Sequence, residues 1–186
     1  MNSSPPRVPP LSDDELDDDV KALLGHTGGV GKGKILNIFR TLARHPALMK
    51  RWLVFGNHVL YKQTLSERDR ELLILRIGWL CRSEYEWGQH VILGRTRGLS
   101  DEEITRITTG PDTEGWDDRD AALLRAVDEL HRDAKIGDDT WAELTGFLDT
   151  LQCIDLVFTV GQYNLVSMAL NTLGVQLDEG LEGFPQ

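Results

Sequence analysis

A glutamate and a histidine four residues apart form the pair in this sequence that is best suited to acid/base chemistry. Glu86 precedes His90 in the stretch Ser-Glu-Tyr-Glu-Trp-Gly-Gln-His, which begins at Ser83. If this stretch is helical, both side chains lie on one face and can share a proton. A second carboxylate, Glu71, lies twelve residues before Ser83 in an apolar segment. The spacing therefore predicts a general acid/base group made of Glu71, Glu86 and His90.

Helices are the elements that must position this group. From Ile35 onward, apolar residues recur at three- and four-residue spacing, and no alternating strand pattern of useful length occurs. The fold class is therefore predicted to be all-α. A break near Cys81 is expected to separate the helix of Glu71 from the helix of His90. Helix starts are expected at Pro46 and at capping-type residues, namely Ser66, Ser83, Ser100, Asp117 and Thr140.

The chain is predicted to hold one helical domain between two less regular ends. The domain is residues 35–178, with a C-terminal tail at 179–186. Residues 1–34 combine a proline-rich tail, a short acidic helix capped by Ser12 and a glycine-rich connector. The connector is close to a phosphate-binding loop, but Ile35 stands where Ser or Thr is needed and no strand precedes it. We therefore interpret it as a flexible link.

The composition argues against a nucleic-acid or membrane surface. Thirty acidic and twenty basic residues give a net charge of −10, which repels polyanions. The N-terminal sequence shows no secretory signal, and two cysteines, Cys81 and Cys153, suit a reducing cytoplasm. The longest apolar stretch, Ile154 to Val175, carries four polar groups and is predicted to be a buried helix rather than a membrane span. We expect a cytoplasmic protein that acts on a small molecule.

Three stretches resemble the carboxymuconolactone decarboxylase family, which includes the alkylhydroperoxidase D-like (AhpD-like) proteins. They are Leu65 to Arg76, then Glu84 to His90 together with Gly98 to Ile104, and finally Tyr163 to Val175. The most specific part is His90 followed by Gly-Leu-Ser-x-x-Glu-Ile. The resemblance implies an AhpD-like helical bundle that assembles as a homo-oligomer, from dimer to hexamer. It also implies an active site at the helix break, near a subunit interface.

The resemblance separates two branches of the family. The peroxidase branch has a Cys-x-x-Cys pair ahead of the histidine and a glutamate one helix earlier. On this chain these four positions fall on Ser83, Glu86, His90 and Glu71, so both thiols are absent. Because a thiol peroxidase needs an attacking thiolate and a resolving thiol, the resemblance favours the decarboxylase branch, which acts on small carboxylated lactones. Two alternatives stay open, namely an alkylhydroperoxidase or peroxiredoxin activity using Cys81 and a non-catalytic ligand- or partner-binding module.

Decarboxylation requires a group that stabilises the developing enolate and a donor that protonates it. We expect His90 to be the donor and Glu86 to orient the ring and raise its basicity. Glu71 would orient a water molecule or relay a proton. The free N–H groups of the turn at Ser83 are expected to bind a carboxylate or an enolate. A structural alternative exists, because Ser83 and Glu86 also have the spacing of a capping box.

Four more residues are predicted to contact the substrate. Arg82 is placed to clamp a carboxylate, and Tyr85 to line a pocket. Gln162 and Tyr163, in the last apolar helix, need buried hydrogen-bond partners and are expected to complete the pocket. Packing and surface ion pairs are the alternative uses of these side chains. No His-x-x-x-His or Glu-x-x-His pair accompanies the acid/base group, so no metal or other cofactor is expected.

Overall fold

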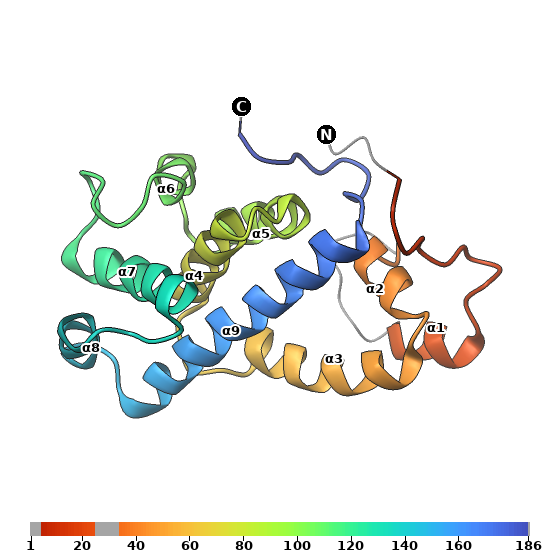
Figure 1. The fold of residues 1–186 in the computed structure, drawn as a ribbon, viewed down its shortest axis with the longest axis horizontal. Coiled ribbons are helices and arrows are strands. Elements are labelled where there is room, and N and C mark those ends of the chain that lie inside the picture. Colours follow the sequence, from red (N-terminus) through yellow and green to blue (C-terminus); the bar gives the residue numbers. More distant parts are fainter. Residues whose placement is uncertain (1–4, 25–33, 186) are drawn as a thin grey trace.

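The computed structural model describes residues 5–24 and 34–185, and within them the regular structure is helical throughout (Figure 1). The all-α prediction is confirmed for this part of the chain. The glycine-rich connector, apart from Lys34, lies outside the described residues. The helices are α1 (Asp18–Leu24), α2 (Asn37–Leu42), α3 (Pro46–Tyr61), α4 (Glu67–Leu80), α5 (Glu84–Thr96), α6 (Asp101–Ile107), α7 (Asp118–Asp133), α8 (Asp138–Thr145) and α9 (Thr150–Leu173).

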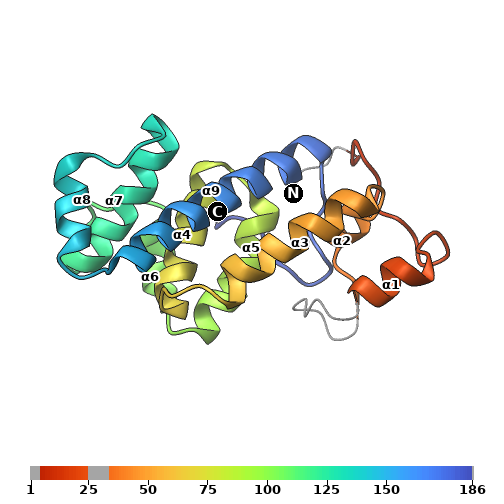
Figure 2. The ribbon, with the colours of Figure 1, turned by 90° about the horizontal axis from the view of Figure 1, so that it is seen from below.

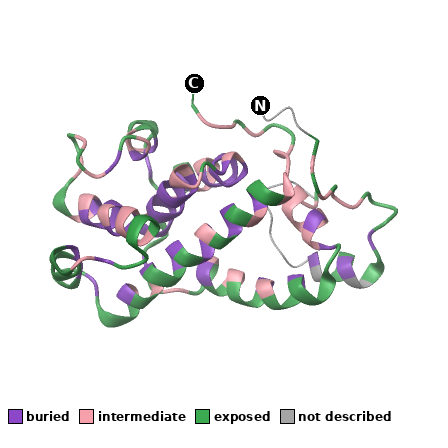
Figure 3. Ribbon diagram, viewed as in Figure 1, coloured by how far each residue is buried: buried purple, intermediate pink, exposed green. Residues whose placement is uncertain are grey.

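Helix α4 is the centre of the fold. It packs against α5, α7 and α9, with α1, α2 and α3 at one end of the molecule and α7 and α8 at the other (Figures 1 and 2). Its side chains are buried all the way round, and Figure 3 shows the buried positions concentrated on α4 and α5. A helix that is enclosed on every side explains why its apolar residues form a continuous run rather than a single stripe. The run is Leu72, Leu73, Ile74, Leu75 and Ile77.

Most helix starts follow from the predicted capping residues. The Ser66 side chain accepts a hydrogen bond from the Asp69 N–H at the start of α4, and Ser100 forms a complete capping box with Glu103 at α6. Pro46 is the first residue of α3. These three predictions are confirmed. The two serines satisfy backbone N–H groups that have no partner within the helix, and Pro46 has no N–H group that would need one.

Other predicted helix boundaries are wrong. The N-terminal helix begins at Asp18 rather than after Ser12, whose hydroxyl and N–H instead bind the Glu15 carboxylate in a turn. Helix α8 begins before Thr140, at Asp138. Helix α9 begins at Thr150, because the Asp149 side chain and Gln152 form a capping box ahead of the apolar run.

The two ends of the chain pack on the helical domain. The Val8 N–H donates to the Leu173 carbonyl, 3.0 Å away, at the end of α9. At the other terminus, the ring of Phe184 meets Trp79 edge-on with centroids 5.0 Å apart, and also contacts Trp87. The C-terminal segment therefore covers part of α4 and α5, and the N-terminal segment reaches the end of α9.

Helix α9 is unusually apolar. Among the described residues it is the one helix long and apolar enough to cross a membrane, although half of its most apolar window is buried inside the protein. Buried and exposed positions alternate along it, so one face belongs to the core and the other faces outward (Figure 3).

Candidate active site

The break between α4 and α5 brings two distant parts of the sequence together. Helix α4 ends at Leu80, and Arg82 adopts a left-handed backbone conformation with φ of 52°. The Ser83 N–H then donates to the Gly78 carbonyl, 2.9 Å away, and α5 starts at Glu84. The chain thereby reverses, and α5 packs along α4.

His90 lies between two carboxylates. Its Nδ1 is 2.6 Å from Oε2 of Glu71, on α4, and its Nε2 is 3.0 Å from Oε1 of Glu86, one turn earlier on α5. The edge-on ring of Tyr163, from α9, lies 5.0 Å away between centroids. Both ring nitrogens are therefore engaged, and the ring is held from a third side.

Glu71, His90 and Glu86 form a row of interacting side chains, and Glu71 is its fixed end. Its side chain is completely buried. The Arg97 Nη1 donates to its Oε1, and the Arg70 Nε lies 3.4 Å from the same oxygen. A buried carboxylate needs such partners because burial without them would cost several kcal/mol. The arginines therefore orient Glu71 toward His90.

The charged groups of this row shift the pKa values of His90 and Glu71 so that each charged form is stabilised. Burial alone would lower the pKa of His90, but the adjacent carboxylates Glu71 and Glu86 outweigh it and raise the pKa to about 9. Burial would raise the pKa of Glu71, but His90, Arg97 and Arg70 hold it below its usual value. At neutral pH the row therefore consists of an imidazolium between carboxylates.

A cavity of about 120 Å³ borders this row. Glu86 and His90 lie in its wall, while Glu71 lies behind His90 and does not reach it. The side-chain oxygen of Gln162, also in the wall, is buried and has no hydrogen-bond partner. The rest of the wall comes from α2, α3, α5 and α9 and is largely apolar, with Ile38, Phe39, Trp52, Leu53, Leu93 and Val166.

The predicted substrate-binding residues divide into two groups. Tyr85, Gln162 and Tyr163 line the cavity, whereas Ser83 and Arg82 do not. Arg82 is exposed. Ser83 is completely buried, its hydroxyl has no hydrogen-bond partner, and it does not cap α5, so the capping box predicted with Glu86 is wrong.

The box does not form because both the Glu86 carboxylate and the Ser83 N–H have other partners. The Glu86 carboxylate, which would complete the box, lies against His90 instead. The Ser83 N–H, which that carboxylate would accept from, is already paired with the Gly78 carbonyl.

Tyr85 is held in place by a residue that the sequence did not reveal. Its hydroxyl donates to Oδ2 of Asp178, 2.5 Å away, and Gln89 donates to the same oxygen at 2.8 Å. The Ile38 N–H donates to the tyrosine oxygen at 3.2 Å. Burial, and then the Asp178 charge, raises the pKa of Tyr85 far above its usual value. Tyr85 is therefore a neutral part of the wall.

Arg97 is the missed residue that a sequence signal could have found. It follows His90 by seven residues, which is two helical turns and hence the same face of α5. Asp178 gives no such signal, because it comes from a segment beyond α9 with no helical periodicity.

Cys81 lies outside the cavity wall. Its thiol donates to Oδ1 of Asn164 at 3.0 Å, and Nδ1 of His131 is 3.9 Å from the sulfur. Burial raises the pKa of this thiol, and burial likewise raises that of Cys153. The raised pKa disfavours the thiolate form of each cysteine.

The residues of the row are also the ones that could coordinate a metal ion. Glu71, Glu86 and His90 are instead paired with one another and with arginine. Within residues 5–24 and 34–185, no group of three or more His, Cys, Asp and Glu side chains is arranged to hold a metal.

Residues 46–129 match the sequence profile of the carboxymuconolactone decarboxylase family. The match covers the helix break, His90 and both glutamates. No curated protein is significantly similar to the chain in sequence.

Solved structures show that the fold is that of AhpD-like proteins. An alkylhydroperoxidase AhpD core, an uncharacterized peroxidase-related protein from Ralstonia eutropha JMP134, is 16% identical with a TM-score of 0.82, covering 95% of both chains. A peroxidase-related protein from Silicibacter sp. TM1040 is 14% identical with a TM-score of 0.80, covering 96% of both. The debrominase Bmp8 is 11% identical with a TM-score of 0.72, covering 92% of both. The same fold is therefore found in peroxidase-related proteins and in a debrominase.

Proposed function

We propose that this protein is an acid/base enzyme of the lyase type that acts on a small carboxylated or lactone-like metabolite. The observation that carries the proposal is the row Glu71–His90–Glu86, with one end buried among arginines and the other end at a cavity. Such an arrangement can deliver a proton to a bound molecule and recover it afterwards.

The direction of proton transfer follows from which atoms are free. The Nδ1 of His90 is blocked by Glu71, which is completely buried and fixed. Its Nε2 faces Glu86, which lines the cavity. Glu86 is therefore the group that passes the proton to the substrate, His90 supplies it, and Glu71 orients the ring. This exchanges the roles that the sequence suggested for the two glutamates.

The proposed reaction is a decarboxylation next to a conjugated carbonyl. The bond between the ring carbon and the carboxylate breaks, carbon dioxide leaves, and the electron pair delocalises as an enolate. The Nε2 proton of His90 passes to the Glu86 carboxylate, which delivers it to that carbon and leaves the imidazole neutral. Water returns one proton to His90, so the substrate carboxylate plus one proton gives the product plus carbon dioxide.

The cavity sets the size of the substrate. A cavity of about 150 Å³ can hold benzene, so about 120 Å³ suits a single five- or six-membered ring. The apolar wall would contact the ring, and the unpaired amide oxygen of Gln162 would accept a hydrogen bond from a hydroxyl group on it. Small lactones, which the family resemblance implies, have this size and polarity.

Thiol peroxidase chemistry has less support. The positions that carry both thiols in the peroxidase branch are Ser83 and Glu86 here, and the Cys81 thiol lies outside the cavity wall with a raised pKa. Bmp8 is described as a debrominase, and one of its structures holds 2,3,4-tribromopyrrole. A small ring compound is thus bound on this fold, whatever the chemistry performed on it.

The proposal can be tested by measuring carbon dioxide release from a panel of carboxylated five- and six-membered lactones. Wild type should release it from at least one of them, and Glu86→Gln should reduce the rate by about 100-fold or more, because general acid/base catalysis contributes roughly 10² to 10⁴. Glu84→Gln is the matched control, since this carboxylate lies in the same helical turn but not in the cavity wall. Equal rates for Glu86→Gln and wild type would refute the proposal.

A further inference from the structure

The outward face of α9 carries a regular apolar seam. Six of its exposed positions are separated alternately by three and four residues, which is the spacing of a helix-pairing seam. The large side chains among them are between 49% and 60% exposed. The seam consists of Leu151, Ile154, Phe158, Gly161, Leu165 and Met168.

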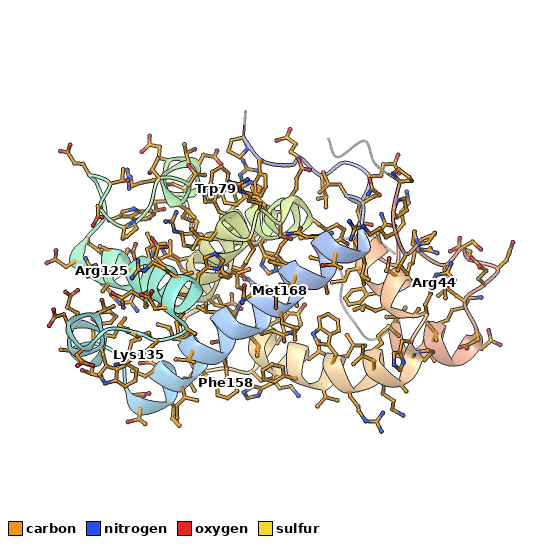
Figure 4. All side chains as sticks on the ribbon, in the orientation of Figure 1. Arg44, Trp79, Arg125, Lys135, Phe158 and Met168 are labelled. Atoms are coloured by element: carbon orange, nitrogen blue, oxygen red, sulfur yellow. The ribbon has the colours of Figure 1, made fainter. Side chains whose placement is uncertain are left out.

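The seam carries no charge and is extended by α3. In the 24 residues of α9 the one charged side chain is Asp155, which accepts hydrogen bonds from Thr64. The ring of Phe55, on α3, contacts Phe158 edge-on at 6.1 Å between centroids. Figure 4 labels Phe158 and Met168 along this helix, and α3 runs beside α9. The exposed apolar side chains of the two helices present on the order of 800 Å², which is what one partner contributes to a standard interface.

The seam can pair with the same seam of a second copy when the two α9 helices run antiparallel. When two copies of α9 run antiparallel, Leu151 lies opposite Met168 and Ile154 opposite Leu165. At the centre, Phe158 of each copy lies opposite Gly161 of the other. A Cβ added at Gly161 would meet no atom within 4 Å, so this position leaves open space where the bulky ring arrives. Large-opposite-small pairing is how helix surfaces interlock.

We propose that this face binds a second copy of the same chain through a two-fold axis between Phe158 and Gly161. A two-fold interface must be self-complementary, and the seam meets that condition. A groove of about 170 Å³ beside the seam, lined by Leu48, Leu165 and Ala169 among others, receives Leu151 of the second copy. The proposal also explains why α9 is apolar on both faces, since one packs in the core and the other in the dimer.

Two substitutions test the pairing by the mass of the particle, measured by analytical ultracentrifugation. Phe158→Lys should weaken dimerisation by about 100-fold or more, because two buried rings are lost per dimer at roughly 1.5–3 kcal/mol each. Trp141→Lys is the matched control: this side chain is also an exposed aromatic, 43% exposed, but lies on α8 outside the seam. Circular dichroism verifies that both variants are folded.

Gly161→Leu distinguishes specific pairing from non-specific hydrophobic association. The added side chain has space within its own chain and a better helix propensity than glycine, so the monomer should fold. It should nevertheless disrupt the dimer, because the Phe158 ring of the second copy loses its space. If the face bound non-specifically, the extra apolar surface would strengthen association, and that result would overturn the proposal.

Cross-linking tests the antiparallel direction. In a chain with Cys81 and Cys153 replaced by serine, Ile154→Cys combined with Leu165→Cys should form disulfide-linked dimers, and Leu165→Cys alone should not. Efficient cross-linking of Leu165→Cys alone indicates a parallel arrangement and contradicts the proposal. A wild-type protein that is monomeric, or that sediments with phosphatidylcholine vesicles through this face, also contradicts it.

Discussion

The charge state of His90 leads to a quantitative prediction about pH. Its pKa rises from an ordinary 6.5 to about 9 in the folded protein, because Glu71 and Glu86 stabilise the imidazolium more than burial destabilises it. At about 1.4 kcal/mol per pH unit, this difference corresponds to about 3 kcal/mol of folding free energy.

The sign follows from which state binds the proton more tightly. The folded state does, so the His90 contribution is fully present below pH 6.5 and is lost as the pH rises toward about 9. The pKa of Glu71 is lowered, so its contribution is present above its ordinary 4.5 and is lost as the pH falls through its folded value. The row should therefore contribute most between these limits, from pH 4.5 to 6.5.

Urea unfolding of wild type and His90→Gln measures this contribution. The difference in unfolding free energy between the two proteins should shrink by about 3 kcal/mol from about pH 6 to about pH 9.5. In parallel, the His90 ring signals should titrate near pH 9 in a carbon-13 NMR experiment, with assignment by their loss in the variant. A difference that is constant with pH, together with titration near pH 6.5, would refute the assignment of an imidazolium between two carboxylates.

Three further substitutions have expected outcomes. Arg97→Met removes the main cation beside the buried Glu71 and should lower the unfolding free energy by about 2–4 kcal/mol, most of it above pH 4.5; a loss within about 0.5 kcal/mol would show that Arg97 does not anchor Glu71. Arg76→Met leaves Asp128 without its paired guanidinium and should cost about 2–4 kcal/mol in the same urea assay, with unchanged activity. Cys81→Ser should leave carbon dioxide release unchanged and show no loss of peroxide turnover, whereas loss of peroxide turnover would favour a thiol mechanism.

The sequence predicted the helix break and the acid/base row because both depend on local spacing. Four residues on a helix place Glu86 against His90 wherever the helix lies in the fold. Glu71 was singled out as a second carboxylate in the preceding apolar segment, but its contact with His90 depends on the reversal at Arg82. A left-handed residue other than glycine or asparagine has no clear signature in sequence.

The errors arise where tertiary contacts compete with local preference. Ser83 has the residue type and spacing of a helix cap, but the backbone bond to Gly78 and the contact of Glu86 with His90 replace the capping box. Likewise, Arg76 is buried in a bidentate pair with Asp128, which lies on another helix. Long-range partners of this kind cannot be inferred from spacing along one helix.

The central claim is that a proton reaches the substrate through Glu86 and His90 without the participation of sulfur. Deuterium incorporation from heavy water into the carbon next to the carbonyl of a small lactone, followed by proton NMR, tests it most directly. The account predicts equal incorporation by wild type and by a protein lacking both cysteines, and almost none by Glu86→Gln. Incorporation that survives in Glu86→Gln, or that disappears with the cysteines, would contradict the account.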